Sequence, residues 1–296
     1  MSASRLREAA GGGGIALRLG PFRVRLVTRL PALLDTLQRL YAPLEAEIPA
    51  GIHDFHVQVN RPGGLRGRWR PQALFLLDGE APFEPFPEDH AFPLFEWGLN
   101  YSIATRAHRY CMLHSAVLEK NGRALILPAM PGSGKSTLCA ALMHRGWRLF
   151  SDEFGLLRPE SGELLPMPRV IPLKNESIDV IRTFAPEAVT GPRFPKTRKG
   201  DVVHVAPTAE SLARQQEGAT PAWIVFPRYR PDAGCRLRPV PGSQAFVRLS
   251  NNAFNYHLLG ETAYRALTNL VKACRSHDLQ YGELEAAVKT LDQLVP

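Results

Sequence analysis

The fold is decided by one stretch of the chain, Ala124-Leu125-Ile126-Leu127-Pro128-Ala129-Met130-Pro131-Gly132-Ser133-Gly134-Lys135-Ser136-Thr137. The apolar run Ala124–Leu127 predicts a buried strand, and the helical run Leu138–Arg145 follows the glycines. Strand, glycine-rich loop and helix in this order are typical of a phosphate-binding loop. The Walker A pattern G-x-x-x-x-G-K-[ST] is met at its last three fixed positions, with Ala129 in place of the first glycine.

The residue types of this loop suit a nucleotide. Gly132 and Gly134 let the backbone turn its N–H groups around a phosphate, and a helix beginning near Lys135 adds the positive end of its dipole. Lys135 supplies a positive charge that binds the β and γ phosphates, and Ser136 supplies a hydroxyl ligand for Mg²⁺. The sequence therefore predicts ATP and Mg²⁺ binding by six consecutive residues, Gly132, Ser133, Gly134, Lys135, Ser136 and Thr137.

A pair of acids follows the next predicted strand. Trp147–Phe150 reads as a strand that ends in Ser151-Asp152-Glu153, and Asp152 lies 17 residues after Lys135 (152 − 135). Motor-type ATPases also carry such a pair, but they usually place other elements between the two motifs, so the short spacing argues against a motor. An aspartate at this strand end faces the same crevice as the phosphate loop and could accept the proton of an attacking hydroxyl.

These motifs together resemble the core of HPr kinase/phosphorylase over about Leu113–Ile178. The resemblance rests on four segments: His114–Leu118, Gly132–Ser136, His144–Leu149 and Ser151–Glu153. Two further segments, Pro172–Ser177 and Lys196–Gly200, are similar to the divergent bacterial group called HprK-related kinase A. In that group, as here, the N-terminal region does not match the HPr kinase N-terminal domain.

The resemblance implies a role for individual residues. Lys135 and Ser136 would bind phosphate and Mg²⁺, Asp152 would be the catalytic base and a metal ligand, with Glu153 beside it, and His114 a polar partner. Glu176, 24 residues past Asp152 (176 − 152), stands about where the family has a second metal ligand, and Arg248 lies in a segment that corresponds to an arginine-bearing one near the active site.

The chain also departs from the family pattern. Glu153 stands in place of the second aspartate and Ala129 in place of the first loop glycine. The glycine-rich signature that contacts the protein substrate and the partner subunit in true HPr kinases is not found after Glu176. The resemblance therefore does not extend to the HPr substrate or to the reverse phosphorylase activity.

A cluster of positive charge lies after the predicted catalytic segment. Net charge is +8, and residues 101–296 carry the whole excess, with 25 basic and 17 acidic residues. Four of these charges fall within seven residues, at Arg193, Lys196, Arg198 and Lys199. Such a run is either a solvated loop or a mobile loop that closes over the transferring phosphate. It lacks the interleaved aromatic residues of a single-stranded nucleic-acid platform, so no nucleic-acid partner is expected.

The rest of the chain predicts two parts, an α+β domain over residues 15–90 and a kinase domain over residues 91–296. Residues 1–14 are expected to fray. Predicted strands of the first part are Ile15–Thr28 (two, around Gly20-Pro21), Phe55–Val59, Leu65–Trp69 and Ala73–Leu77, with a helix from Pro31 to Leu44. Residues 81–93, with four prolines and three phenylalanines, predict an extended docked segment at the boundary. Later elements are a helix over Leu94–Thr105, a hairpin over Cys111–Leu127 around Asn121-Gly122, strands over 202–205, 222–226 and 237–240, and helices over 261–274 and 283–294.

Composition excludes several classes. No apolar stretch approaches the ~20 residues of a membrane helix, and the start of the sequence lacks the apolar middle of a signal peptide, so we expect a cytoplasmic protein without a membrane partner. The four cysteines are scattered without a C-x-x-C pair, which favours buried reduced thiols over a zinc site or disulfides.

The sequence thus predicts an α/β protein, a P-loop kinase domain of HPr kinase type with a smaller N-terminal α+β domain. The expected reaction is transfer of the γ-phosphoryl group of ATP to a hydroxyl, most simply a serine of a protein or peptide acceptor. Two alternatives stay open, a small-molecule hydroxyl kinase in a biosynthetic pathway and an ATP-binding sensor that transfers nothing. A homo-oligomer is also left open.

Overall fold

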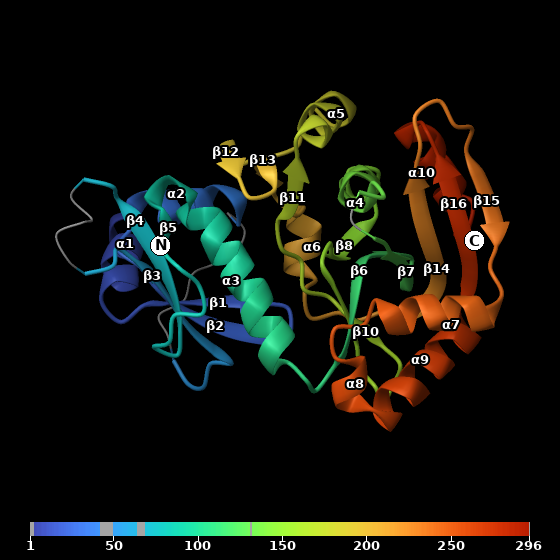
Figure 1. The fold of residues 1–296 in the computed structure, drawn as a ribbon, viewed down its shortest axis with the longest axis horizontal. Coiled ribbons are helices and arrows are strands. Elements are labelled where there is room, and N and C mark those ends of the chain that lie inside the picture. Colours follow the sequence, from blue (N-terminus) through green and yellow to red (C-terminus); the bar gives the residue numbers. More distant parts are fainter. Residues whose placement is uncertain (1–2, 42–49, 64–68, 131, 296) are drawn as a thin grey trace.

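The computed structural model describes residues 3–41, 50–63, 69–130 and 132–295 (Figure 1). The predicted strand over Leu65–Trp69 falls, apart from Trp69, outside the described residues, as do Leu44 of the predicted helix and Pro131 of the phosphate loop. The chain is a mixed α/β protein, and its described residues form three sheets. No helix in the described ranges is long and apolar enough to cross a membrane.

The N-terminal sheet has the order β1-β2-β3-β4-β5. Its strands are β1 (Ile15–Leu19), β2 (Phe22–Val27), β3 (Phe55–Asn60), β4 (Gln72–Leu77) and β5 (Phe86–Pro87). Alternate residues of β2 are buried, as the period-2 pattern predicts. Helix α2 (Pro31–Leu40) connects β2 to its parallel neighbour β3 and buries one leucine-rich face.

Two predictions about this part are wrong. Residues 3–11 form helix α1 (Ala3–Gly11) instead of fraying, because Leu6 and Ala10 are buried in the N-terminal core. The segment 81–93 is not extended throughout: β5 is followed by the 3-10 helix η2 (Glu88–His90), and helix α3 (Ala91–Arg106) begins before Phe92 and Pro93. Pro93 fits in the helix because the first turn of a helix needs no backbone N–H at that position.

Helix α3 packs on the N-terminal sheet and faces the C-terminal half with its other side (Figure 1). Its apolar residues Phe92, Phe95, Leu99 and Ile103 join the N-terminal core. Gly98 permits close approach to β4, because a Cβ there would overlap the ring of Phe75. The same core also contains Phe154, Met167 and Phe194 from the C-terminal half, so the two halves pack against each other.

The C-terminal sheet has eight strands in the order β10-β9-β6-β7-β14-β16-β15, with β8 paired to β6. The strands are β6 (Cys111–Lys120), β7 (Arg123–Pro128), β8 (Arg148–Ser151), β9 (Phe154–Leu157), β10 (Leu164–Leu165), β14 (Thr220–Tyr229), β15 (Arg236–Pro239) and β16 (Arg275–Tyr281). The predicted β6–β7 hairpin is confirmed, with its turn at Asn121 and Gly122, both at positive φ. Strands β7, β14 and β16 run parallel.

Helices cover both faces of this sheet. One face packs on α4 (Lys135–Met143) and α10 (Leu284–Asp292), and the other on α7 (Gly242–Asn251) and α9 (Glu261–Ala273), with the short α8 (Tyr256–Leu259) beside them. The alternation of β7 explains the two layers, because Leu125 and Leu127 lie in the first core and Ala124 and Ile126 in the second. All four cysteines are free, Cys111 and Cys139 fully buried and the other two half-buried.

A small third sheet, β11-β13-β12, borders the main sheet. It consists of β11 (Ile171–Lys174), β12 (Phe194–Thr197) and β13 (Gly200–Val205), with α5 (Glu176–Phe184) after β11 and α6 (Ala209–Ala213) after β13. Phe194 stacks on Phe92 of α3 with ring centroids 6.3 Å apart, so this sheet also contacts the N-terminal half. The basic segment 196–200 therefore forms the turn of a hairpin that lies beside α3 (Figure 1).

Candidate functional site

The loop between β7 and α4 has the backbone that its glycines predicted. Gly132 and Gly134 have φ angles of +83° and +84°, which residues other than glycine rarely adopt. At Gly134 a Cβ would also come within 2.5 Å of Tyr281 Oη, which donates a hydrogen bond of 3.2 Å to the Gly134 carbonyl oxygen. Ala129, which replaces the first glycine of the pattern, is not among the residues at positive φ, so alanine is accommodated there without strain.

Strand order brings Asp152 beside this loop. Strand β6 lies between β7 and β8 and is antiparallel to both, so β7 and β8 run parallel and their carboxyl ends meet at one edge. Asp152 follows β8 directly. Its carboxylate accepts hydrogen bonds from both residues that begin α4: Lys135 Nζ lies 3.1 Å from Oδ1, and Ser136 Oγ lies 2.7 Å from Oδ2. Lys135 Nζ also donates to the Asp152 backbone oxygen.

Burial changes the acid–base behaviour of this pair. Lys135 and Asp152 are only 9% and 4% exposed. Burial raises the pKa of Asp152, and the charge of Glu153 adds to the rise, while Lys135 opposes it without cancelling it. Burial lowers the pKa of Lys135, but the attraction of Asp152 and Glu153 outweighs it and the pKa is raised. Lys135 thus stays charged, and Asp152 is a stronger proton acceptor than an exposed aspartate.

Glu153 and His114 form the neighbouring group. His114 Nε2 on β6 lies 3.8 Å from Glu153 Oε1, and the imidazole stacks on Phe254 with centroids 5.3 Å apart. Burial lowers the pKa of His114, and Lys135 and Lys199 lower it further, although Glu153 raises it. His114 is therefore mostly neutral near pH 7, and its 3.8 Å contact with Glu153 is longer than a hydrogen bond.

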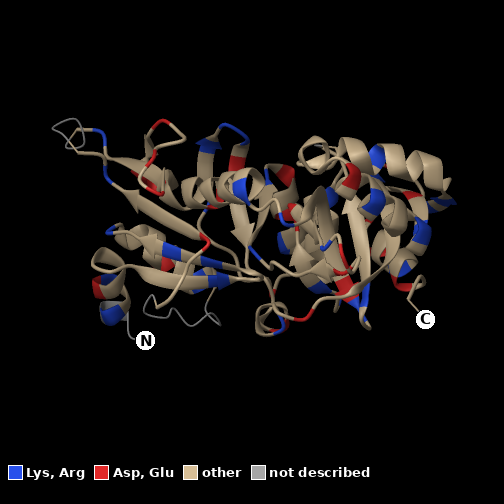
Figure 2. Ribbon diagram, turned by 90° about the horizontal axis from the view of Figure 1, so that it is seen from below, with Lys and Arg blue, Asp and Glu red and all other residues tan. Residues whose placement is uncertain are grey.

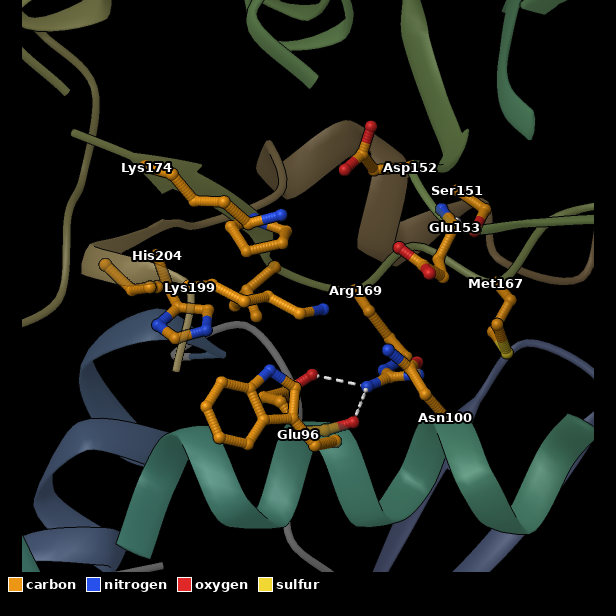
Figure 3. A pocket seen from close by; sticks show the side chains of 14 residues that line it. Glu96, Asn100, Ser151, Asp152, Glu153, Met167, Arg169, Lys174, Lys199 and His204 are labelled. Carbon is orange, nitrogen blue, oxygen red and sulfur yellow. Dashed lines mark hydrogen bonds and ion pairs between the residues drawn. The ribbon is translucent and has the colours of Figure 1, made fainter. Parts of the chain in front are cut away.

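The basic hairpin turn divides into two parts. At one end, Asp201 holds the loop, because it pairs with Arg193 at 2.8 Å and accepts the backbone N–H of Lys196 at 3.0 Å. At the other end of the turn, Lys199 points into the space in front of Asp152 and Glu153, and Lys174 points into the same space from the end of β11 (Figure 3). Desolvation and the charge of Lys199 lower the pKa of Lys174.

Positive and negative residues are otherwise scattered over both halves of the molecule (Figure 2).

Glu176, Arg248 and Thr137 make none of the side-chain contacts described for this group. Glu176 is exposed at the start of α5, and in the described part of the chain no three His, Cys, Asp or Glu side chains are close enough to hold a metal ion between them. The contacts described for Arg248 are an ion pair with Asp278 at 2.7 Å and the ring of Phe226, on the face of the sheet opposite α4. Thr137 is half-buried on α4 next to Ser136.

A cavity of about 40 Å³ lies in front of Asp152 and Glu153 (Figure 3). Residues with no role predicted from the sequence form much of its wall: Glu96, Trp97 and Asn100 from α3, Arg169 before β11, Lys174 at its end, and His204 on β13. Arg169 donates to Glu96 Oε2 at 2.5 Å and to Asn100 Oδ1 at 2.6 Å. Among these wall residues, only Lys174 had a sequence signal, because it lies in the segment Pro172–Ser177 that carries part of the resemblance.

Comparison with known proteins adds no relative. A scan against protein-family models and a search of curated proteins both ended without a match to the chain.

Proposed function

We propose that the chain is a P-loop phosphotransferase of HPr kinase type, which transfers the γ-phosphoryl group of Mg·ATP to a hydroxyl, in the first instance a serine of a protein or peptide. One observation carries the proposal. The buried carboxylate of Asp152 is bound by Lys135 and Ser136, the two residues that begin the helix after the phosphate loop. A lysine, a hydroxyl and a carboxylate at one point are the groups that phosphoryl transfer requires.

The donor set fits Mg²⁺ and triphosphate. Ser136 Oγ and Asp152 Oδ2, 2.7 Å apart, are hard oxygen ligands of the kind that Mg²⁺ prefers. When bound, the metal would neutralise charge on the phosphoryl oxygens. Lys135 would bind the β and γ phosphates, and the backbone N–H groups around Gly132 and Gly134 would surround them.

In the transfer step, the acceptor oxygen would form a bond to the γ phosphorus while the bond to the β–γ bridging oxygen breaks. The acceptor proton would pass to Asp152, and ADP would leave with the electron pair of the broken bond. Lys199 and Lys174, which point into the same space, would stabilise the oxygens of the phosphoryl group in transit (Figure 3).

Two variants test the proposal. Lys135→Ala should weaken Mg·ATP binding by about ten- to a hundredfold, because it removes a charge-assisted contact in a buried loop. Asp152→Asn should still bind ATP but lose roughly 10² to 10⁴ in transfer rate. Exposed Lys272 on α9 provides the matched control, Lys272→Ala.

The measurements are ATP titration and transfer of label from γ-labelled ATP to a lysate of the source organism. Equal ATP affinity of wild type and Lys135→Ala would refute the phosphate-loop interpretation. Label in small molecules would favour the small-molecule kinase. Tight ATP binding with no transfer to any acceptor, together with an ATP-dependent change in partner affinity, would favour the sensor.

A further inference from the structure

A second and larger cavity, of about 300 Å³, adjoins the one at Asp152. The two cavities share four lining residues, Trp97, Asn100, Glu153 and Lys199. They are therefore neighbouring parts of one space, with Glu153 and Lys199 at the junction. A molecule whose hydroxyl reaches Asp152 has this larger cavity as the place for the group next to that hydroxyl.

The N-terminal half supplies an aromatic wall of this cavity. Phe83, Phe86 and Trp97 line it, and the rings of Phe86 and Trp97 are 5.7 Å apart. Phe83 is held between Phe75 at 5.9 Å and Tyr101 at 5.2 Å. Because these rings pack on one another behind the cavity surface, the wall is already formed in the free protein. An aromatic wall that is already formed suits an apolar ligand group, and the cavity also contains four polar residues, Asn100, Glu153, Arg198 and Lys199.

The basic hairpin turn closes the other side. The guanidinium of Arg198 lies 5.3 Å from the Phe86 ring centre, and the ammonium of Lys199 lies 5.9 Å from that of Trp97. These contacts attach the turn to the N-terminal half through cation–π attraction. The turn thus lines the cavity together with the aromatic wall and Glu153.

We infer that the N-terminal half selects the acceptor: the larger cavity binds an aromatic or large aliphatic side chain adjacent to the serine that is phosphorylated. This inference rests on the proposed function and specifies its substrate. A peptide fits the arrangement because an extended chain rises about 3.3–3.6 Å per residue and presents every second side chain on the same face, so a side chain close to the serine reaches the neighbouring cavity. Trp97 and Phe86 are then the specificity-determining residues, and neither belongs to the phosphate loop.

The test uses the full chain, γ-labelled ATP and serine peptide pools in which one position at a time, from three before the serine to three after it, is fixed as Phe, Leu, Gly, Asp or Lys. Wild type should label Phe or Leu pools at one position about tenfold more than the Gly pool, the discrimination expected of a single apolar pocket. Trp97→Ala and Phe86→Ala should reduce this preference to about twofold or less while the Kd for Mg·ATP stays unchanged. Trp69→Ala, which removes a tryptophan that is 90% exposed, should keep the full preference.

The outcomes separate this inference from the proposed function. Labelled peptides without an apolar preference in wild type, or a preference that survives in both Trp97→Ala and Phe86→Ala, would overturn the pocket assignment and leave the kinase standing. Tight ATP binding with no label in any peptide pool would overturn the peptide kinase itself. Phe86 is part-exposed in the two-residue strand β5, so Phe86→Ala decides the matter if Trp97→Ala does not fold.

Discussion

The ion pair between Glu96 and Arg169 joins the two halves of the protein behind the candidate site, and Glu96→Ala tests how much it contributes. Both side chains are less than a tenth exposed. Arg169 Nη2 donates to Glu96 Oε2 at 2.5 Å and to the Glu96 backbone oxygen at 2.9 Å, and Tyr41 Oη donates to Glu96 Oε1 at 3.0 Å. Removing the carboxylate leaves the Arg169 charge buried with only neutral partners, the Asn100 side chain and that backbone oxygen.

Breaking a buried pair in this way costs about 3–5 kcal/mol, because the remaining charge has lost its water and its counter-ion. The two neutral partners that Arg169 keeps place the expected loss near the lower end, about 3 kcal/mol. Replacing both residues, as Glu96→Met with Arg169→Met, should recover most of this loss, since no charge is then left uncompensated.

Urea unfolding of full-length variants measures these values. Glu261→Ala provides the control, because Glu261 pairs with Arg265 on the surface of α9 with both side chains more than 70% exposed. It should change the unfolding free energy by less than about 0.5 kcal/mol. The reasoning is refuted if Glu96→Ala costs no more than Glu261→Ala, or if the double methionine variant is less stable than Glu96→Ala.

Three further predictions concern pH and the basic turn. Burial and Glu153 raise the pKa of Asp152 above its ordinary 3.8 in the protein without bound metal, so kcat/KM, which follows the free enzyme, should fall as the pH falls through that raised pKa, and Glu153→Gln should move the acid limb of the kcat/KM profile to lower pH. Burial lowers the pKa of His204 from 6.5 to about 3. Below pH 6.5 His204 therefore binds a proton in the unfolded chain but stays neutral in the folded protein. The free energy of unfolding should decrease by about 1.4 kcal/mol per pH unit as the pH falls from 6.5 towards 3. Urea unfolding of His204→Leu should show a weaker dependence of this free energy on pH. The third change replaces the basic residues of the turn, Lys196, Arg198 and Lys199, by alanine. It should lower turnover far more than the unfolding temperature, because exposed charges contribute little to folding. Unchanged turnover would show that the turn is only a solvated loop.

Local signals account for the parts that the sequence predicted correctly. Asn121-Gly122 specifies a hairpin turn through residues that tolerate positive φ, and the glycines of the phosphate loop do the same before α4. Asp152 was placed at its strand end because only 17 residues separate it from Lys135, too few for another strand and helix. In each case, neighbours in sequence determine the geometry.

Features built from distant segments escaped prediction. Strand β16, Arg275–Tyr281, lies inside the sheet between β14 and β15, yet its sequence RSHDLQY is mostly polar and has no apolar run. Its burial depends on Ser276, Leu279 and Tyr281, and Tyr281 supports the phosphate loop. The pair Glu96–Arg169 spans 73 residues, so neither residue carries a local sign of its partner.

The contacts of Lys135 suggest how nucleotide binding and base activation are connected under the proposed function. In the free protein the ammonium lies against Asp152 Oδ1 and the Asp152 backbone oxygen. An ammonium has three donors, and those that turn to the phosphates of ATP are lost to Asp152. Oδ1 of Asp152 would then be free to meet the acceptor hydroxyl, while Oδ2 would stay with Ser136 and with Mg²⁺ when the metal is bound. Under the proposed function, the base would therefore become accessible only when ATP binds, which would limit proton transfer to the loaded site.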